Sequence, residues 1–339
     1  MLDERFYRLV FLRGSLGLGE SYMQQYWECD DLEGLFSRLV NSGLERRSQQ
    51  LPMQRMSRLF DRVFNQQSRV KSLRNAEHHY NLGNDLFLRF LGPYRNYSCG
   101  YFKEAATLEQ AQLAKMRLLC EKLELKATDH LLDVGGGWGE FARFAATEYG
   151  CRVTSINIAD EQIEFARQHC SGTGVEIVKK DYRDLSGSFD KIAVIAMFTH
   201  VGYKNYRSFM ETLHGLLAPD GRMIMETVGG LSPKVCCEPW TNKYIFPGGL
   251  IPTLGQVDVA IDGLFRRVAV EEFGHYYTRT LRCWHENLMA AWPTISDHYS
   301  ETMRRMFEYY FLSVAGAFSA RGLLHYHIEF IPERPRDDA

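Results

Sequence analysis

The chain has 339 residues, of which 45% are hydrophobic and 13% aromatic, so it can bury a full α/β domain together with a smaller accessory domain. This composition argues against an intrinsically disordered protein. The formal net charge of −2 provides no overall field that would attract nucleic acid or an anionic membrane, so any such attraction has to come from a local patch. We predict no nucleic-acid partner.

The cysteines and the apolar stretches limit the setting in which the protein works. Eight cysteines are scattered without a CxxC pair or a histidine spacing suited to zinc, and an apolar signal-peptide run is missing from the N-terminus. Charges interrupt every apolar stretch well before the roughly 20 residues that a transmembrane helix needs. We expect a reduced cytoplasmic protein that binds no metal and touches a membrane only peripherally, at its inner face.

Residues 1–75 have helical character and few strand signals, which predicts a helical N-terminal domain for docking or dimer contact and a second domain over 76–339. From Glu45 to Arg74, eight basic residues stand against two acidic ones, and apolar residues recur close to helical spacing. The pattern predicts a basic amphipathic helix. Such a helix either lies on anionic lipid or packs on the second domain with its arginines in solvent, and the sequence leaves both open.

Short apolar runs of β type alternate with helical patterns from about Ala127 onward. The first five runs are His130–Gly135, Arg152–Ile158, Glu176–Lys180, Lys191–Met197 and Arg222–Val228. Two later runs, Arg267–Phe273 and His325–Ile331, are candidates for the last strands, with a helical stretch over Tyr277–Arg321 between them. The alternation predicts an α/β fold in which helices cover both faces of a mostly parallel, seven-stranded sheet.

A glycine-rich loop directly follows the first predicted strand. The segment Leu131–Gly139 reads L-L-D-V-G-G-G-W-G, and a helix is expected to begin near Glu140. Glycines allow close approach of the backbone to a ligand, and the helix N-terminus offers free N–H groups. A tight structural turn would need the same residues, but the preceding Asp and the position after the first strand favour a nucleotide-like ligand. The predicted contacts are Asp133, Gly135, Gly137 and Gly139.

The details of this loop favour S-adenosylmethionine (SAM) over NAD. An NAD site typically has G-x-G-x-x-G and an acid about 20 residues further on, whereas here the second strand ends in Asn157. Asn157 or Gln162 would then contact the ribose hydroxyls, and Asp181 and Tyr182, after the third strand, would meet the adenine. Asp181 can also be explained as the cap of the helical turn that follows it.

Motifs spread over the whole chain resemble those of the cyclopropane fatty acid synthases, relatives of the mycolic acid cyclopropane synthases. The matching segments are Gly14–Tyr22, Trp27–Asp30, His79–Phe87, Tyr97–Tyr101, Leu108–Gln112, Asp181–Asp184, Met197–Gly202, Asn242–Pro247 and Ala315–Phe318. The resemblance implies a Rossmann-like SAM-dependent methyltransferase fold whose helical insertions form a slot for an acyl chain. It also implies a homodimer and, as substrate, the double bond of an unsaturated acyl chain in a membrane phospholipid.

In that family the segment matching Tyr97 and Ser98 holds SAM with the glycine loop, and bicarbonate acts as the base. An alkene is a poor nucleophile, so it has to be held against the methyl group in a dry apolar slot. Aromatic faces can stabilise the resulting carbocation, and a base removes a proton so that the ring closes. The aromatic candidates are Tyr97, Tyr101, Phe102, Phe198, Tyr244, Phe246, Tyr277, Trp284 and Trp292.

The match breaks at the bicarbonate site. Carried over by position, the family's cysteine is Cys99 and its tyrosine is Tyr277, but its glutamate is Thr199 here and its histidine is Glu226. Three hypotheses follow: Glu226 is itself the base, with its pKa raised by apolar surroundings; it helps to bind bicarbonate with Cys99 and Thr199; or deprotonation is altered and the product is a branched chain. We expect ring formation to be retained. The neighbouring His200 is expected to support the site structurally.

Three other functions remain as alternatives. A related C-methyltransferase acting on a soluble alkene or isoprenoid would keep the SAM residues but would have no need of the basic N-terminal segment. A catalytically inactive lipid-binding relative is suggested by the changed bicarbonate site, although it would have no need to keep Tyr97, Ser98 and the glycine loop. An NAD oxidoreductase would require the acid that Asn157 replaces.

Overall fold

The computed structural model describes residues 1–44, 67, 84–234 and 237–333. The predicted basic helix between Glu45 and Arg74, the predicted domain boundary at residue 75 and most of the His79–Phe87 motif lie outside the described residues. The division into two domains therefore stays a prediction.

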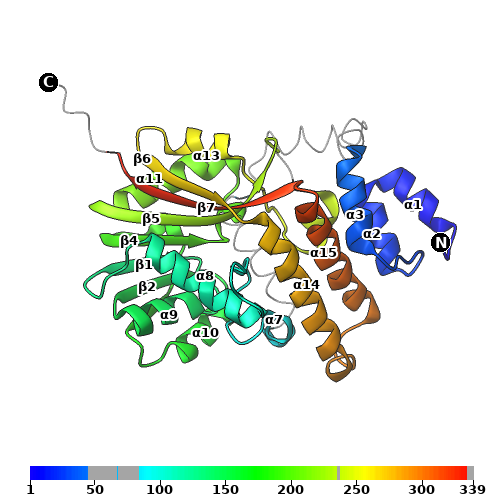
Figure 1. The fold of residues 1–339 in the computed structure, drawn as a ribbon, viewed down its shortest axis with the longest axis horizontal. Helices are drawn as coiled ribbons and strands as arrows, with labels where there is room; N and C mark the ends of the chain where they lie inside the picture. Colours follow the sequence, from blue (N-terminus) through cyan, green and yellow to red (C-terminus); the bar gives the residue numbers. More distant parts are fainter. Residues whose placement is uncertain (45–66, 68–83, 235–236, 334–339) are drawn as a thin grey trace.

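Seven strands form a single sheet at one end of the molecule (Figure 1). They are β1 (His130–Val134), β2 (Arg152–Asn157), β3 (Val175–Lys179), β4 (Phe189–Ile195), β5 (Leu217–Gly230), β6 (Phe265–Glu272) and β7 (Leu323–Pro332). Each predicted run coincides with one of these strands, so the seven-stranded α/β prediction is confirmed. The strand order is β3-β2-β1-β4-β5-β7-β6.

The sheet is parallel from β3 to β5, and β7 runs antiparallel to both of its neighbours, β5 and β6. The order of the strands changes direction at β1, which lies between β2 and β4. The carboxyl ends of strands at such a point border a crevice where ligands bind in α/β proteins. The glycine-rich loop after β1 therefore begins at this position.

Helices cover both faces of the sheet, as predicted. On one face, α8 (Leu108–Lys122) and α9 (Glu140–Tyr149) pack on side chains such as Leu131, Val153 and Ile224. On the other, α11 (Tyr206–Leu216) and α13 (Leu254–Ile261) pack on the alternate strand residues, among them Leu132 and Met225. This alternation follows from the two-residue period of a strand. The remaining helix of the βα units is α10 (Asp160–His169).

A layer of long helices separates the sheet from the N-terminal helices (Figure 1). It consists of α7 (Asn84–Leu91), α14 (Gly274–Ala291) and α15 (Glu301–Ser319). The helical stretch predicted over Tyr277–Arg321 is divided at the short helix Trp292–Thr294, because Pro293 cannot continue an α-helix. The next helix begins at Glu301 and is capped by Ser300, whose side chain accepts a hydrogen bond from the Met303 backbone N–H.

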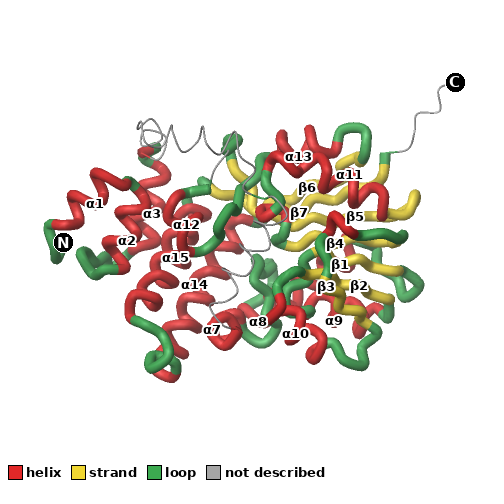
Figure 2. The backbone as a smooth tube through the Cα atoms, turned by 180° about the vertical axis from the view of Figure 1, so that it is seen from behind, coloured by secondary structure: helices red, strands yellow, loops and turns green. Residues whose placement is uncertain are grey.

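The N-terminal helices pack on the far side of this layer, as the view from behind shows (Figure 2). They are α1 (Arg5–Arg13), α2 (Ser15–Met23) and α3 (Leu32–Asn41), and α2 also contacts α12 (Pro239–Tyr244). The predicted helical character is thus confirmed for the described part of residues 1–75. The contact between α3 and α15 is close: a Cβ at Gly316 would lie 2.4 Å from the backbone oxygen of Glu33.

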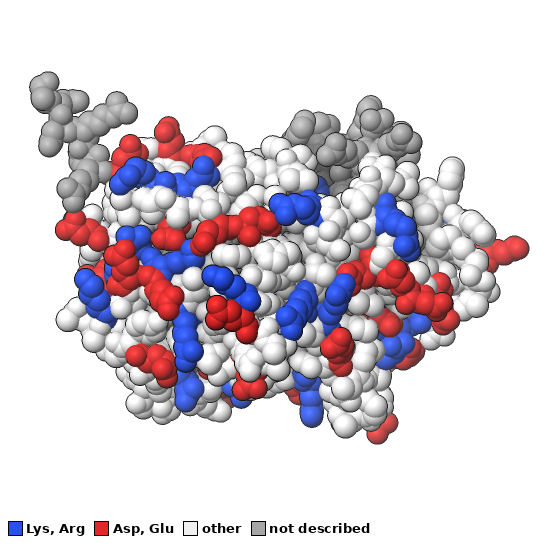
Figure 3. Space-filling model, in the orientation of Figure 1, with Lys and Arg blue, Asp and Glu red and all other residues white. Residues whose placement is uncertain are grey.

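Charge is mixed on the face of the molecule drawn in Figure 3, where basic and acidic side chains alternate over the described surface. This agrees with the net charge of −2. Within the described part of the chain, every helix is too short or too polar to cross a bilayer.

The α3–α15 contact predicts that Gly316→Ala destabilises the protein. The new methyl group would meet backbone atoms of α3 that cannot move independently, so we expect a loss of about 1–3 kcal/mol in the free energy of unfolding. Gly215→Ala is the matched control, since Gly215 is also helical and a Cβ there would meet nothing within 4 Å. Urea unfolding of both variants measures the difference, and equal stability of the two would contradict the close packing.

Candidate active site

The glycine-rich loop turns sharply after β1. The backbone N–H groups of Gly135 and Gly136 both donate to the Ile156 carbonyl, at 2.9 and 3.1 Å. A Cβ at Gly136 would lie 1.8 Å from the Ser155 hydroxyl, whereas a Cβ at Gly137 would meet nothing within 4 Å. Gly136 therefore packs against the sheet, while Gly137, with a φ of 54°, lies on the open side where a ligand could approach.

Asp133, the acid before this loop, is buried at the end of β1. Its carboxylate accepts a hydrogen bond of 2.8 Å from the Ser155 hydroxyl. Burial raises the pKa of Asp133 from 3.8 to about 6, and the hydrogen bond from Ser155 opposes this shift only in part. The protein thus carries a buried carboxylate next to the loop at a cost in stability.

The structure brings Asn157 and Gln162 together, as expected for two residues of one polar site. The Asn157 side-chain amide donates to Gln162 Oε1 at 2.9 Å and lies 3.3 Å from the Gly137 carbonyl oxygen. Its carbonyl oxygen accepts from the backbone of Ile158 and Ala159, which fixes the side chain at the start of α10. These contacts place an uncharged polar pair beside the glycine-rich loop.

Asp181 and Tyr182 follow β3, but their side chains have structural partners. The Asp181 carboxylate accepts from the Arg183 backbone N–H at 3.0 Å and from its guanidinium at 2.9 Å, so it caps the helical turn Tyr182–Asp184. The alternative explanation for Asp181 is therefore confirmed. The Tyr182 ring packs edge-on against Phe209 in the hydrophobic core. Contact of either residue with adenine stays a prediction.

The segment Tyr97–Tyr101 lies between α7 and α8, and α8 holds it in place. Gln112 donates to the Ser98 carbonyl at 2.9 Å, and the Lys115 ammonium donates to the Ser98 hydroxyl. The Tyr97 ring contacts Phe87, which in turn contacts Trp138 of the glycine-rich loop, with ring centroids 5.4 and 5.6 Å apart. Two predicted parts of the SAM site are thus joined through aromatic contacts.

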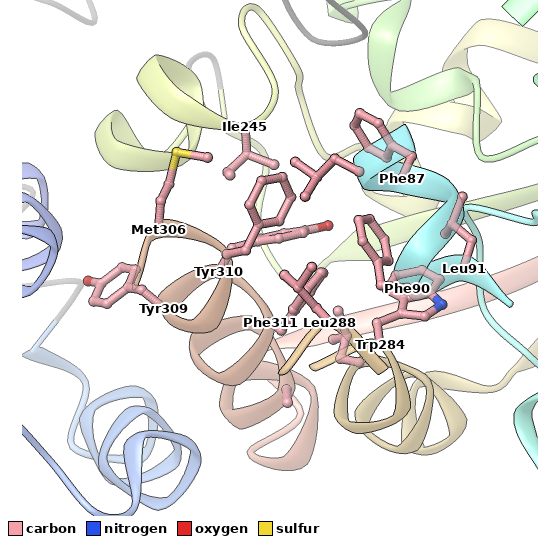
Figure 4. Packing of buried hydrophobic residues seen from close by; sticks show 14 of the residues in the cluster. Phe87, Phe90, Leu91, Ile245, Trp284, Leu288, Met306, Tyr309, Tyr310 and Phe311 are labelled. Atoms are coloured by element: carbon pink, nitrogen blue, oxygen red, sulfur yellow. The ribbon is translucent and has the colours of Figure 1, made fainter. Parts of the chain in front are cut away.

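Tyr97 also borders a large apolar cluster between α7, α14 and α15 (Figure 4). Its hydroxyl lies 3.2 Å from that of Tyr310, and its ring contacts Trp284 and Phe246. Most side chains drawn in Figure 4 point toward one another, whereas Tyr309 points toward the N-terminal helices; those labelled are Phe87, Phe90, Leu91, Ile245, Trp284, Leu288, Met306, Tyr309, Tyr310 and Phe311. The region beside the glycine-rich loop is therefore apolar and rich in aromatic faces.

Most of the predicted aromatic candidates belong to this apolar cluster. Its buried members among them are Phe102, Tyr277, Trp284 and Trp292, and the partly buried Tyr97, Tyr244 and Phe246 pack against it. Phe198 is different, because it stacks on Tyr206 in the core under the opposite face of the sheet. Tyr101 lies against Phe273 and Tyr276.

Glu226 lies in a buried polar cluster on the face of β5 that α8 covers. It has no exposed surface, and one carboxylate oxygen is 3.1 Å from His325 Nε2. The other oxygen is 3.9 Å from His327 Nε2 and 4.0 Å from the Lys115 ammonium. Glu226 is directly opposite His327 in the pairing of β5 with β7, which places these side chains on the same face.

The three hypotheses about Glu226 stay predictions, but its surroundings are polar rather than apolar. Burial raises the pKa of Glu226, whereas the positive charge of Lys115 and the hydrogen bond with His325 lower it, and the pKa lies below its usual range. These partners come from α8 and β7, far from Glu226 along the chain.

Cys99 and Tyr277 lie near Glu226, and Thr199 makes no direct hydrogen bond to them within the described structure. Burial, and then the charge of Glu226, raises the pKa of the Cys99 thiol, and Glu226 also contributes to the raised pKa of Tyr277. Thr199 lies on the turn Phe198–His200, where its carbonyl accepts from Leu250 N at 2.7 Å; no bond joins its side chain to Cys99 or Glu226 among the described residues. A shared site of Thr199 with these residues stays a prediction.

Binding of bicarbonate with the help of Glu226 stays a prediction. An ionised carboxylate can only accept hydrogen bonds, so Glu226 could accept the O–H of bicarbonate but could not donate to its other oxygens as a histidine could. His200 contacts the Phe246 ring at 5.8 Å, and burial lowers its pKa to about 4, so it is a neutral residue of the site wall at neutral pH.

Sequence reasoning missed Lys115, His325 and His327. Lys115 occupies the apolar stripe of α8 between Ala111 and Leu119, a position where a buried lysine requires a partner. His325 and His327 alternate with apolar residues along the last strand, which placed both on one face of the sheet. Both signals were present in the sequence, but neither of them indicates that Glu226 is the partner of Lys115, His325 and His327.

The parallel sheet, the glycine-rich loop after β1 and the polar pair at the end of β2 define a SAM-dependent methyltransferase. The sequence model of the mycolic acid cyclopropane synthetase family matches residues 67–328. The cyclopropane-fatty-acyl-phospholipid synthase of Escherichia coli (strain K12) is 42% identical over 328 residues, which cover 96% of this chain and 85% of the relative. The chain belongs to this family, and the resemblance of its motifs is confirmed.

Other relatives differ in the reaction that their names state. The tuberculostearic acid methyltransferase UfaA1 of Mycobacterium tuberculosis is 30% identical over 349 residues, covering 97% of this chain and 81% of the relative.

Among solved structures, mycolic acid cyclopropane synthase CmaA1 complexed with SAH and CTAB matches with a TM-score of 0.72 at 28% identity, over 77% of this chain and 98% of that chain. These comparisons support SAM as the cofactor.

The buried Asp133 predicts a pH-dependent gain in stability for Asp133→Asn. Because the pKa is raised, ionisation of Asp133 above about pH 6 destabilises the folded state. Below pH 3.8 the residue is protonated in both the folded and the unfolded state. The variant should therefore be more stable than the parent by up to roughly 3 kcal/mol at pH 7.5, with the difference disappearing near pH 4.

Thermal unfolding of the SAM-free proteins at both pH values measures this difference. Asp160→Asn is the control, because the Asp160 side chain is 72% exposed and pairs with Lys179 at the surface. A stability difference for Asp133→Asn that is the same at both pH values would contradict the assignment of the buried charge. We also expect weaker SAM binding by Asp133→Asn than by the control.

Proposed function

We propose that this enzyme adds a methylene group from SAM across the double bond of unsaturated acyl chains in phospholipids, forming cyclopropane fatty acids. The observation that carries the proposal is the apolar aromatic cluster that adjoins the glycine-rich loop through Tyr97, Phe87 and Trp138. A soluble polar substrate would not need such surroundings. The relative from Escherichia coli is named for the same reaction, and the match covers 96% of this chain and 85% of that relative.

Each part of the site has a role in this proposal. Asp133, Gly135, Gly137 and Gly139 form the SAM cradle with Asn157 and Gln162, and Asp181 and Tyr182 border it. Tyr97 and Ser98 close the cradle toward the apolar cluster, since α8 fixes Ser98 and Tyr97 contacts Tyr310. SAM supplies the methyl group, and the aromatic walls exclude water from the attacking alkene.

The aromatic rings also stabilise the positive charge that the methyl transfer leaves on the acyl chain. Tyr97 and Trp284 present their rings to one another at 5.2 Å, and Phe90 lies 6.1 Å from Trp284. Ring faces attract a cation most strongly where water is excluded, which fits the buried position of Trp284. Cys99, Tyr277 and Glu226 lie on the side from which the proton is removed.

A methyl-branched product is the second candidate. The loss of the family's glutamate at Thr199 and the low pKa of Glu226 both change the site that completes the ring. The relative named tuberculostearic acid methyltransferase shows that a different product name occurs among similar chains.

The test is the product formed by purified protein from SAM and vesicles of unsaturated phospholipid. Gas chromatography with mass spectrometry should detect fatty acids that gain one CH₂ and resist hydrogenation, because a ring has no double bond to reduce. A product that gains one CH₂ but takes up hydrogen would identify a methyl- or methylene-branched chain, because loss of a proton without ring closure leaves a double bond. Absence of any lipid product from protein that binds SAM would contradict the proposed function.

We further infer that the enzyme docks peripherally on the membrane that contains its substrate, through helix α1. This helix has no buried residue, and the Phe11 and Tyr7 side chains are 85% and 62% exposed. They lie one helical turn apart, next to Leu12 and the basic Arg8. An exposed apolar face with basic neighbours is the pattern of a helix that lies at a lipid surface.

The docking proposal predicts that Phe11→Glu weakens binding to vesicles of anionic unsaturated phospholipid by about tenfold or more, because an aromatic ring no longer enters the lipid. Val259→Glu is the control, since Val259 is 76% exposed on α13, away from α1. Co-sedimentation measures binding for both. Unchanged binding by Phe11→Glu would exclude this face, and a change in oligomeric state instead would assign it to a contact between two copies of the chain.

A further inference from the structure

The buried cluster of Glu226, His325, His327 and Lys115 is the part of the molecule whose chemistry the proposed function leaves open. The reaction requires a base, and the Glu226 carboxylate in this cluster already has His325 and Lys115 as partners. His325 and His327 are each only 2% exposed. Buried polar atoms normally have a hydrogen-bond partner inside the protein, and those that lack one require an explanation.

We propose that His325 is the general base of this enzyme: its Nδ1 accepts the proton from the newly added methyl group, and Glu226 positions the imidazole through Nε2. The inference rests on the proposed function. It replaces an external base by a histidine and carboxylate pair that the chain itself supplies.

The hydrogen bonding of His325 fits this role. Nε2 is 3.1 Å from Glu226 Oε1, and because an ionised carboxylate can only accept, Nε2 must carry the hydrogen. In the neutral ring the lone pair is then on Nδ1, which has no hydrogen-bond partner within the described structure. A histidine oriented by a carboxylate in this way is the proton acceptor of many enzymes, and the carboxylate stabilises the imidazolium that forms.

The position of His325 fits as well. Its ring lies edge-on to the Tyr277 ring with centroids 5.2 Å apart, and Tyr277 stacks on Phe318 at 4.5 Å. Both aromatic residues belong to the apolar cluster in which the acyl chain is expected. On its other side His325 borders Cys99 and Lys115 around a small space under the Tyr97–Tyr101 segment. His325 thus lies where the apolar and the polar parts of the site meet.

The other groups of the cluster are poorer bases. Burial lowers the pKa of His327 to about 3, so its ring stays neutral and binds a proton weakly. Burial likewise lowers the pKa of Lys115, but the charge of Glu226 opposes this shift and its ammonium already donates to Ser98. The titratable groups around His325 are Cys99, Lys115, Glu226, Tyr277 and His327.

A metal ion explains the cluster less well. The ligand atoms of Glu226, His325 and His327 all lie within 4.8 Å of one another, which is close enough for a shared ion, so the deciding feature is the charge beside them. The Lys115 ammonium is 4.0 Å from Oε2 of Glu226, the oxygen nearest to His327. A divalent cation would have to share this space with a positive charge.

The proposed step is balanced. A C–H bond of the methyl group breaks, its electron pair forms the second ring bond to the cationic carbon, and the proton forms a bond to His325 Nδ1. The imidazolium and the Glu226 carboxylate then form an ion pair of no net charge. The proton leaves for solvent after the ring has closed, which restores the neutral histidine.

The test compares His325→Gln with the parent in the vesicle assay, without added bicarbonate. Glutamine keeps a donor for Glu226 but offers no basic nitrogen, so we expect ring formation to fall by roughly 10²–10⁴-fold while SAM binding is unchanged. His327→Gln is the matched control on the same strand and should retain most of the activity. Thermal unfolding of both variants shows whether they are folded.

Glu226→Gln provides a second measurement that a structural role would not affect. Without the carboxylate the imidazolium is less stable, so the histidine stays unprotonated to lower pH. The acid limb of the pH–kcat profile should therefore move to lower pH, with a reduced maximum and little change in KM. Normal folding of the variant together with an unshifted limb would exclude the positioning role.

Three results would overturn the proposal. They are ring formation by folded His325→Gln at the rate of the parent, complete dependence of the parent on added bicarbonate, and a stoichiometric divalent metal in the purified parent that Glu226→Gln loses. Failure of the parent itself to modify lipid would instead contradict the proposed function, so the two outcomes can be distinguished.

Discussion

A carboxylate with no exposed surface has to be matched by positive charge and hydrogen-bond donors, and the site of this enzyme depends on meeting that requirement at Glu226. Removing such a charge from water costs several kcal/mol, and removing one partner of a buried pair costs about as much again. The partners come from separate parts of the chain: Lys115 from α8 and His325 from β7. Lys115 also holds Ser98, so the same charges position the loop that adjoins the SAM cradle.

The central sheet could be predicted because strands covered on both faces form short, nearly continuous apolar runs, which the sequence shows clearly. The boundary between α14 and α15 was missed although Pro293 marks it, because the apolar period continues on either side of the proline. The antiparallel position of β7 has no local signal. It depends on β5 and β6 leaving a gap between them, which is a property of the whole sheet.

Residues of the site could be predicted from the sequence only where they belong to a family motif. Cys99, Tyr277 and Glu226 were placed together by position in the family motifs, and the structure puts them near one another. The environment of Glu226 could not be derived in the same way, since His325 is 99 residues away in sequence and meets it only through the register of two strands. A pKa depends on such partners, so the hypothesis of apolar surroundings could not take into account the charge of Lys115, which lowers the pKa of Glu226.

The packing of α3 on α15 has a consequence for the order in which the protein can fold. Helix α3 leaves the ribosome before Gly316, which receives it and is made roughly 280 residues later. At roughly 5–20 residues per second this interval lasts about 15–60 s. Throughout that time the apolar side of α3 lacks its partner on α15, and the sheet lacks β7. The nascent chain is therefore exposed to aggregation until α15 and β7 are complete.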